Sequence, residues 1–182
     1  IVMSVMNGFR TELIDKILGF NPHVIVKSYD EPITHITKTE IKKINKDIKS
    51  ISYSFSGEGI IIHQSSSKGI VIRGYSKDDL KKTILSKNNI FEGSLDNFDK
   101  NTISKGKDLA IALDLMIGDK ITLMSSSSIE TIFGNLPLQK TFSISSIFDS
   151  GLAEYNQNVI FMHLNDSISF FEANEKDIFI EI

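Results

Sequence analysis

The stretch Ile51–Tyr75, ISYSFSGEGIIIHQSSSKGIVIRGY, decides the fold because two apolar runs rich in β-branched residues flank a short polar link. The first run extends from Ile51 to His63, and Gly57-Glu58-Gly59 within it predicts a bulge or a turn. The second run, Gly69 to Gly74, follows the link of residues 65–68. Two strands separated by turn residues predict a β-hairpin.

A strand and a helix precede this hairpin. The segment His23–Val26 has the β-branched composition of a short strand. Thr37 and Glu40 then match the T-x-x-E pattern of a helix capping box. Three apolar residues follow at helical spacing on one face: Ile41, Ile44 and Ile48.

Two short helices are predicted in the middle of the chain. Ser76 and Asp79 cap the first. The second spans Asp108 to Met116 and is closed by Gly118. Its inward-facing residues are Leu109, Ala112, Leu113 and Met116. The polar stretch between the two helices places a subdomain boundary near Phe91.

Strands dominate the rest of the sequence. They are predicted at Lys120–Ser125, Thr141–Phe148, Val159–Leu164 and Ile178–Ile182. In the second of these, apolar residues alternate on one face, namely Phe142, Ile144 and Phe148. A helix capped by Asp166 or Ser167 follows the third. The predicted fold class is therefore α+β.

The composition limits the possible partners. The 182 residues, 41% hydrophobic and 24% charged, are typical of one globular domain or a domain with a smaller subdomain. A net charge of −3 without a basic stripe argues against nucleic acid as a partner. The sequence has no cysteine, which excludes disulfides and cysteine-based metal sites. It also has no run of about 18 apolar residues that could span a bilayer.

The sequence contains no recognisable catalytic, metal or cofactor motif. Its histidines, His23, His35, His63 and His163, lack the spacing of a metal site. Neither a G-x-S-x-G nucleophile nor a phosphate-binding loop is present. Asp78-Asp79 fits the negative first turn of a helix better than a catalytic pair. We therefore expect no enzyme activity, cofactor or metal, and a soluble hydrolase lacks support.

The N-terminal segment has the pattern of a helix that ends near Gly19, before Asn21-Pro22. Its apolar residues recur at helical spacing: Val2, Val5, Met6, Phe9, Leu13 and Ile17. One interpretation is an amphipathic helix packed on its own domain. The other is the aqueous end of a membrane helix.

A connection of about a dozen residues is predicted between the strands ending near Ser125 and beginning near Gln139, which is long for a hairpin. It combines turn-forming residues with apolar ones, which are Ile129, Ile132, Phe133, Leu136 and Leu138. Apolar residues on a projecting loop either fold back onto their own domain or contact a partner.

The segment Val2–Arg10, VMSVMNGFR, resembles the end of the first membrane helix of the lipoprotein-releasing (LolC/LolE) permeases, within the wider MacB-like family of ABC transporters. Further matches follow in the order of that family across essentially the whole chain. They are Glu12-Leu13, Ile17-Gly19, Gly74, Phe91-Gly93, Leu109-Asp119, Phe142-Ile144, Phe148 and Gly151.

This resemblance implies a periplasmic domain of a bacterial inner-membrane permease. Residues 1–20 would be the periplasmic end of the first membrane helix. A βαβ-rich "porter" subdomain would comprise residues 21–90 and 164–182, and a β-rich "sabre" subdomain, residues 91–163, would be inserted in it. The resemblance also implies a separate LolD-like ATPase subunit, a second permease copy and mechanical coupling between them.

The family also implies a hook at residues 127–138 that captures a LolA-like periplasmic chaperone, which receives the lipoprotein cargo. The implied binding residues are Ile132, Phe133, Gly134, Leu136 and Pro137 in the hook, with Gln139 and Lys140 in a pad at its base. Asn135 stands where the family pattern has a basic residue. Alternatives are a LolE-like role in lipoprotein contact and a MacB-like efflux or mechanotransmission permease that docks an adaptor protein.

Overall fold

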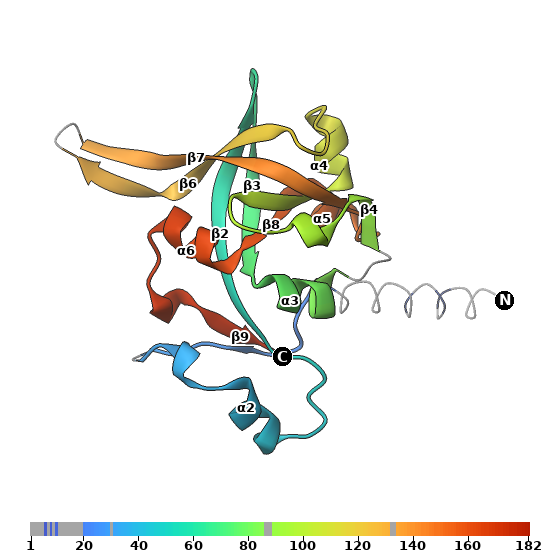
Figure 1. Ribbon diagram of the computed structural model, residues 1–182, viewed down its shortest axis with the longest axis vertical. Coiled ribbons are helices and arrows are strands. Elements are labelled where there is room, and N and C mark those ends of the chain that lie inside the picture. The colour runs from blue at the N-terminus through green and yellow to red at the C-terminus, as the bar shows by residue number, and fades with distance from the viewer. Residues whose placement is uncertain are drawn as a thin grey trace.

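The computed structural model describes residues 20–29, 31–85, 89–131 and 134–182, together with Met6, Gly8 and Arg10. In this part of the chain, paired strands form a closed ring (Figure 1). Around the ring they are β2 (Ser52–His63), β3 (Ser66–Tyr75), β8 (Val159–His163), β5 (Thr102–Gly106), β7 (Gly134–Phe148) and β6 (Lys120–Thr131). The ring closes where Gly59–Ile62 of β2 pairs with Thr122–Ser125 of β6.

The ring mixes parallel and antiparallel pairing. β3 runs parallel to β8, and β5 runs parallel to β7, whereas the other neighbours are antiparallel. Outside the ring, β9 (Phe179–Glu181) pairs with the start of β2, and β1 (Ile25–Val26) pairs with β9. β4 (Ile90–Gly93) pairs with the end of β7.

Short helices cover the ring and its ends. They are α2 (Lys38–Ile44), α3 (Lys77–Asp79), α4 (Lys107–Ala112), α5 (Ala153–Asn158) and α6 (Leu164–Phe171). α3 continues as a π-helical turn, η2 (Leu80–Ile84), and the 3-10 turns are η1 (Ile33–His35), η4 (Leu95–Asn97) and η5 (Glu175–Asp177). The molecule is thus a mixed α/β domain.

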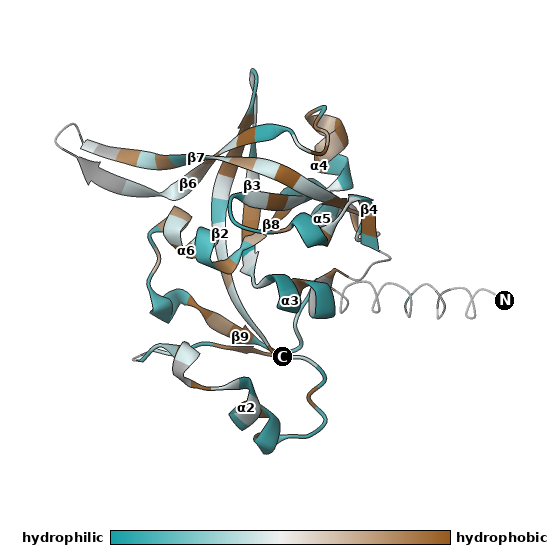
Figure 2. Ribbon diagram, in the orientation of Figure 1, coloured by the Kyte–Doolittle hydropathy of each residue, from teal (hydrophilic) through white to brown (hydrophobic). Residues whose placement is uncertain are grey.

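The main core fills the interior of the ring. Alternate residues of β3 and β8, such as Ile72 and Ile160, point inward and are fully buried. α6 adds Phe170 and Phe171, and α4 adds Leu109. Each such side chain stabilises the fold by about 1.5–3 kcal/mol through the removal of apolar surface from water. Figure 2 shows the hydrophobic residues along the strands of the ring.

Two smaller clusters pack outside the ring. One contains Phe20, Tyr75, Leu80, Leu85, Leu95, Phe98, Phe148, Val159 and Phe161. The other contains Ile33, Ile41, Ile51, Ile178 and Ile180 and joins α2 to the sheet beside β9. The alternation of β8 places Phe161 outside and Ile160 inside, so the ring wall separates two apolar layers.

The prediction that Phe148 shares a face with Phe142 and Ile144 is wrong. Phe142 and Ile144 face the interior of the ring, whereas Phe148 belongs to the outer cluster. The register of β7 against β5 shifts by one residue, because Ile103 opposes Ile144 and the next residue, Ser104, opposes Ser146. A bulge of this kind moves the following side chains to the other face.

The bulge or turn predicted at Gly57-Glu58-Gly59 is absent, since β2 pairs with β3 through these residues without a shift. The absence of a side chain at Gly57 and Gly59 instead allows neighbouring groups to pack closely against β2. A Cβ at Gly57 would lie 2.7 Å from the ring of Phe171, and one at Gly59 would lie 2.8 Å from the backbone oxygen of Met124. The hairpin itself is confirmed, although β3 begins at Ser66, inside the predicted polar link.

The predicted N-terminal caps of two helices are present in the structure, whereas some residues predicted to face inward are exposed. The Thr37–Glu40 capping box and the Ser76 cap are both present. However, Ile44 is 84% exposed at the last residue of α2. α6 is preceded by His163 rather than capped by Asp166 or Ser167, because Asp166 accepts from the backbone of Asn101 and Ser167 Oγ donates to the carbonyl of Leu164.

The predicted helix from Asp108 to Met116 is shorter and starts one residue earlier. α4 ends at Ala112, and Asp114 adopts a left-handed conformation. Met116 is 66% exposed rather than inward, and its amide donates to the carboxylate of Asp119. The amide of Asp119 in turn donates to the carbonyl of Met116, so these two residues close the turn between α4 and β6.

The N-terminal pattern at residues 1–19 lies outside the described residues except for Met6, Gly8 and Arg10. Among the described residues, no helix is long and apolar enough to cross a membrane. The predicted boundary near Phe91 falls in β4, and strands from both sides of it contribute to the ring.

Candidate functional site

The ends of β6 and β7 project from the ring as a two-stranded ribbon (Figure 1). As far as Ser125, β6 pairs with β2 on one side and with β7 on the other. Beyond this point, the described pairs of β6 are with β7, from Ser128 opposite Pro137 to Thr131 opposite Gly134. The residues in this part of the chain are therefore held in paired strands and do not form an irregular loop.

The prediction of a dozen-residue connection between Ser125 and Gln139 is consequently wrong. Most of residues 127–138 belong to the paired strands, since β6 extends to Thr131 and β7 begins at Gly134. An irregularity marks the base of the ribbon, where Ser125 to Ser127 oppose Leu138 alone. Ser125 Oγ donates to the carbonyl of Ser127 at 2.8 Å, which holds this bulge. Bulges bend and twist a ribbon locally.

Two of the predicted binding residues, Ile132 and Phe133, lie outside the described residues. Gly134 follows them with φ of +103°, a conformation that favours glycine. Leu136 is 51% exposed, and Pro137 is also exposed. Figure 2 shows this hydrophobic stretch on the projecting part of β7.

Strand geometry divides the predicted binding residues between two faces. Successive side chains of a strand point to opposite faces, so Leu136 and Leu138 share the face of Lys140 and Phe142. Pro137 and Gln139 lie on the other face. The predicted set is therefore close in sequence but is not one continuous surface.

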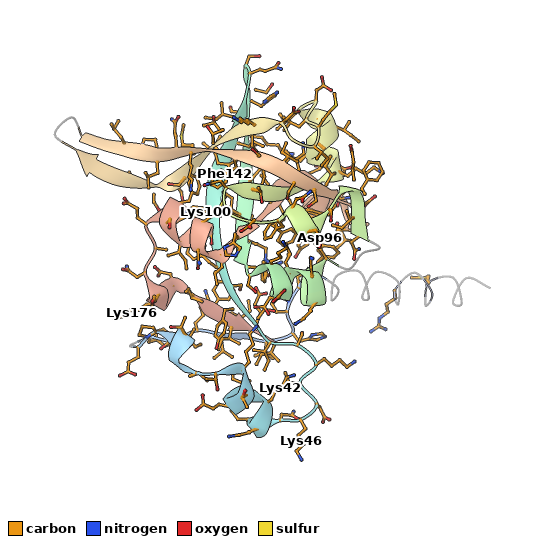
Figure 3. All side chains as sticks on the ribbon, in the orientation of Figure 1. Lys42, Lys46, Asp96, Lys100, Phe142 and Lys176 are labelled. Atoms are coloured by element: carbon orange, nitrogen blue, oxygen red, sulfur yellow. The ribbon has the colours of Figure 1, made fainter. Side chains whose placement is uncertain are left out.

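The base of the ribbon is joined to α6. Lys140 Nζ lies 3.7 Å from the Oδ1 atom of Asp166 and 5.1 Å from the centroid of the Phe142 ring. The carboxylate of Asp166, which is buried, also accepts from the amide of Asn101 at 2.6 Å. Phe142 contacts Phe170 edge to face, and Figure 3 marks its place where the ribbon meets the ring.

A groove of about 1590 Å³ lies along β2 and β3. Its walls come from α5, the segment that precedes β1, and the chain between α6 and β9. Val71 and Arg73 of β3 lie on its floor, and Leu152, Tyr155 and Phe179 on its sides. The lining mixes apolar and charged residues, which differs from the enclosed apolar pocket of a small-molecule site.

One lysine in the interior is bound by a backbone carbonyl. Lys105 is fully buried, and its Nζ donates to the carbonyl of Leu115 at 3.0 Å. Burial lowers the pKa of Lys105 to about 8, although the nearby carboxylates of Asp119 and Glu92 act in the opposite direction. In the described part of the chain, no group of three or more His, Asp or Glu residues is arranged to hold a metal ion.

Sequence reasoning missed Asp166 and Asn101 as neighbours of the ribbon. It also missed the buried ion pair between Arg73 and Glu181. The first two are 65 residues apart and the last two are 108 residues apart, so local spacing carries no signal for either contact. One available signal is that Arg73 interrupts an apolar strand, where a charged residue requires a partner.

Comparisons with known proteins give the context of this fold. The LolC protein of Neisseria meningitidis, a "lipoprotein-releasing system transmembrane protein", is 23% identical over 179 residues, which is 97% of this chain. The LolE protein of Haemophilus influenzae is 32% identical over 130 residues, 68% of this chain, and LolC of that organism is 30% identical over 184 residues, 91% of this chain. The chain resembles the LolC and LolE proteins. It spans 43%, 31% and 42% of the lengths of these relatives.

Solved structures support the same fold. The extracellular domain of the ABC-type transporter YknZ from Gram-positive bacteria aligns with a TM-score of 0.52 and 13% identity, covering 87% of this chain and 81% of that chain. The periplasmic region of MacB from Actinobacillus actinomycetemcomitans aligns with a TM-score of 0.51 and 11% identity, covering 87% and 72%. No protein-family model matches the chain. The resemblance to LolC and LolE that was predicted from the sequence is thus confirmed, and the fold is similar to that of the YknZ and MacB domains.

Proposed function

We propose that this chain is the periplasmic domain of an inner-membrane ABC-transporter permease that releases lipoproteins and hands them to a LolA-like chaperone. The similarity to LolC and LolE over most of the chain supports the lipoprotein-releasing role. The relatives are more than twice as long, which is consistent with membrane helices on either side of this domain. Residues 1–20 would belong to the first of them.

The observation that carries the docking role is the projecting ribbon with exposed Leu136 at its outer part. A paired ribbon holds its side chains at a fixed distance from the ring, so a chaperone can contact them without a clash with the domain. Leu136 and Pro137 are exposed on it, and together with the neighbouring Ile132 and Phe133 of the sequence they form the apolar set that we propose contacts the partner. The ribbon, residues 127–138, is the proposed hook, and Gln139 with Lys140 forms the proposed pad.

The remaining parts of the proposal concern the whole transporter. Residues 21–90 and 164–182 would form the porter part and residues 91–163 the sabre part. The domain itself would be non-catalytic, with ATP hydrolysed by a LolD-like subunit in the cytoplasm. A second permease copy would complete the membrane unit, and lipoprotein cargo would pass between the two.

Release of a lipoprotein from membranes tests this function. Spheroplasts or proteoliposomes with the periplasmic face outward, containing the full-length permease, its ATPase and enclosed ATP, would be incubated with the chaperone outside. We expect lipoprotein to appear in the soluble fraction in complex with the chaperone, and to depend on both additions. Retention of lipoprotein in the membrane under all conditions would contradict the proposal.

The second candidate is a MacB-like efflux or mechanotransmission permease that docks an adaptor protein. The alignment with the periplasmic region of MacB favours it. In this case the full-length permease would copurify with a periplasmic adaptor, and ATP would not drive lipoprotein release. The two candidates thus differ in which protein the ribbon captures.

A further inference from the structure

Arg73 connects three parts of the domain through one buried guanidinium. Its Nη1 atom donates to the carbonyl of Phe20 at 2.9 Å, and its Nη2 atom contacts the Oε1 atom of Glu181 at 2.8 Å. The first partner lies in the N-terminal part of the chain, and the second lies in β9, near the C-terminal end of the sequence. Arg73 itself belongs to β3, in the wall of the ring.

Neighbouring side chains complete this contact. The hydroxyl of Tyr75, also in β3, donates to the Oε2 atom of Glu181 at 2.6 Å. The guanidinium of Arg73 lies 5.2 Å from the centroid of the Tyr75 ring. Both carboxylate oxygens of Glu181 therefore bind to β3, and all three side chains are buried. Burial raises the pKa of Tyr75 above its usual range, so its hydroxyl stays a donor.

The two end segments are also paired with each other. The amides of His23 and Val24 both donate to the carbonyl of Ile182, at 2.9 and 3.1 Å, and the amide of Ile182 donates to the carbonyl of Val24 at 3.0 Å. β1 and β9 continue this pairing. Phe20 packs on Phe148 and Tyr155 at the side of the ring. The segments 20–26 and 179–182 thus form one unit.

We infer that Arg73 is a positioning residue that, together with the pairing of β9 and β2, fastens this unit to the ring, so that both end segments, the ring and the ribbon move as one body. β3 pairs with β2, and β2 pairs with β6, which continues into the ribbon. A guanidinium suits the role because its fork binds a carboxylate and a carbonyl at the same time. The inference rests on the proposed function, in which membrane helices continue from both end segments and transmit the movement produced by ATP hydrolysis.

Backbone hydrogen exchange in the full-length permease tests the fastening itself. Arg73→Met should raise the exchange rates of the His23, Val24 and Ile182 amides at least tenfold, because these segments would open locally. Amides of β8 in the ring should keep their rates. Unchanged rates at His23, Val24 and Ile182 would overturn the inference, and so would an equal rise throughout the ring.

If Arg73→Met does not fold, a second variant tests the same contact. Glu181→Gln keeps the size of the side chain but loses the charge and one of the two acceptor oxygens, and it should raise the same rates by a smaller factor. Ile160→Ala is the matched control, because Ile160 is a buried residue of the ring wall and its apolar cluster contains no residue of either end segment. It should raise the exchange of ring amides and not preferentially that of the end segments.

A transport assay distinguishes a loss of coupling between ATP hydrolysis and lipoprotein release from a loss of fold stability. In membranes with ATP and chaperone, Arg73→Met should hydrolyse ATP at the wild-type rate while lipoprotein release falls at least tenfold. Ile160→Ala, with a similar drop in melting temperature, should keep the wild-type ratio of release to hydrolysis. Equal loss of this ratio in both variants would overturn the coupling role. If the wild-type permease releases no lipoprotein, the proposed function fails, and the exchange rates still decide whether Arg73 fastens the ends.

Discussion

The ring of Phe171 packs directly over Gly57, so closely that a Cβ at this position would lie 2.7 Å from the ring atoms. Phe171 is the last residue of α6, and its ring also contacts Phe55, with centroids 5.2 Å apart. The absence of a side chain at residue 57 therefore allows α6 to close one end of the ring. This relationship explains why a glycine lies in the middle of a long strand.

Replacing Gly57 tests this contact. Gly57→Ala should lower the free energy of unfolding by about 1–3 kcal/mol, because the added methyl group displaces the Phe171 ring. Gly69→Ala is the control, since nothing lies within 4 Å of a Cβ at that residue of β3. Urea unfolding measures both, and the control should change by less than about 0.5 kcal/mol. Equal stability of the two variants would show that the ring does not depend on Gly57.

Because Lys105 is buried, we expect the free energy of unfolding to depend on pH in the alkaline range. Its pKa in the folded protein is about 8, below the ordinary value of 10.5, because of burial. Between these values the unfolded chain binds more protons than the folded one, so the free energy of unfolding rises with pH, by up to about 1.4 kcal/mol per pH unit. Urea unfolding from pH 7 to pH 10 should show this rise in the wild type relative to Lys105→Met. Parallel curves would contradict it.

We expect Asp166 to contribute more than Lys140 to the stability of the fold at the base of the ribbon. Asp166→Ala should cost about 1–3 kcal/mol, because the Asn101 amide loses its acceptor in a partly buried place. Lys140→Ala should cost less than about 1 kcal/mol, because the Lys140 side chain is 37% exposed and its ion pair is screened by solvent. Asp166→Asn, which keeps an acceptor oxygen, is the control. Thermal unfolding of the three variants gives the order, and a larger loss in Lys140→Ala would reverse this account.

Local features of the sequence were sufficient for some elements. The Thr37–Glu40 capping box and the Ser76 cap depend on residues three apart, and both form. The hairpin of β2 and β3 follows from two apolar runs and a polar link. In each case the stabilising partners are close along the chain, which is why the pattern predicts the structure.

Other features depend on partners that are distant in sequence. Residues 125–128 are all serine, and Pro137 lacks an amide donor, so a loop was predicted where opposite strands pair. The ring closes because β6 pairs with β2. The two strands lie about 60 residues apart in the sequence, so no local pattern specifies which of their residues pair. The contact of Lys140 with Asp166 likewise follows from the placement of α6, which no motif encodes.

Binding of the LolA-like chaperone to this chain tests the docking role of the ribbon most directly. Leu136→Asp should weaken the complex at least a hundredfold, because it would bury a charge in an apolar contact, at a cost of several kcal/mol. Ile44→Asp is the matched control, since Ile44 is an equally apolar, 84% exposed residue on α2, away from the ribbon. Titration calorimetry should give wild-type affinity for Ile44→Asp and little or no binding for Leu136→Asp. Equal affinities of all three proteins would contradict the assignment of the ribbon as the docking site.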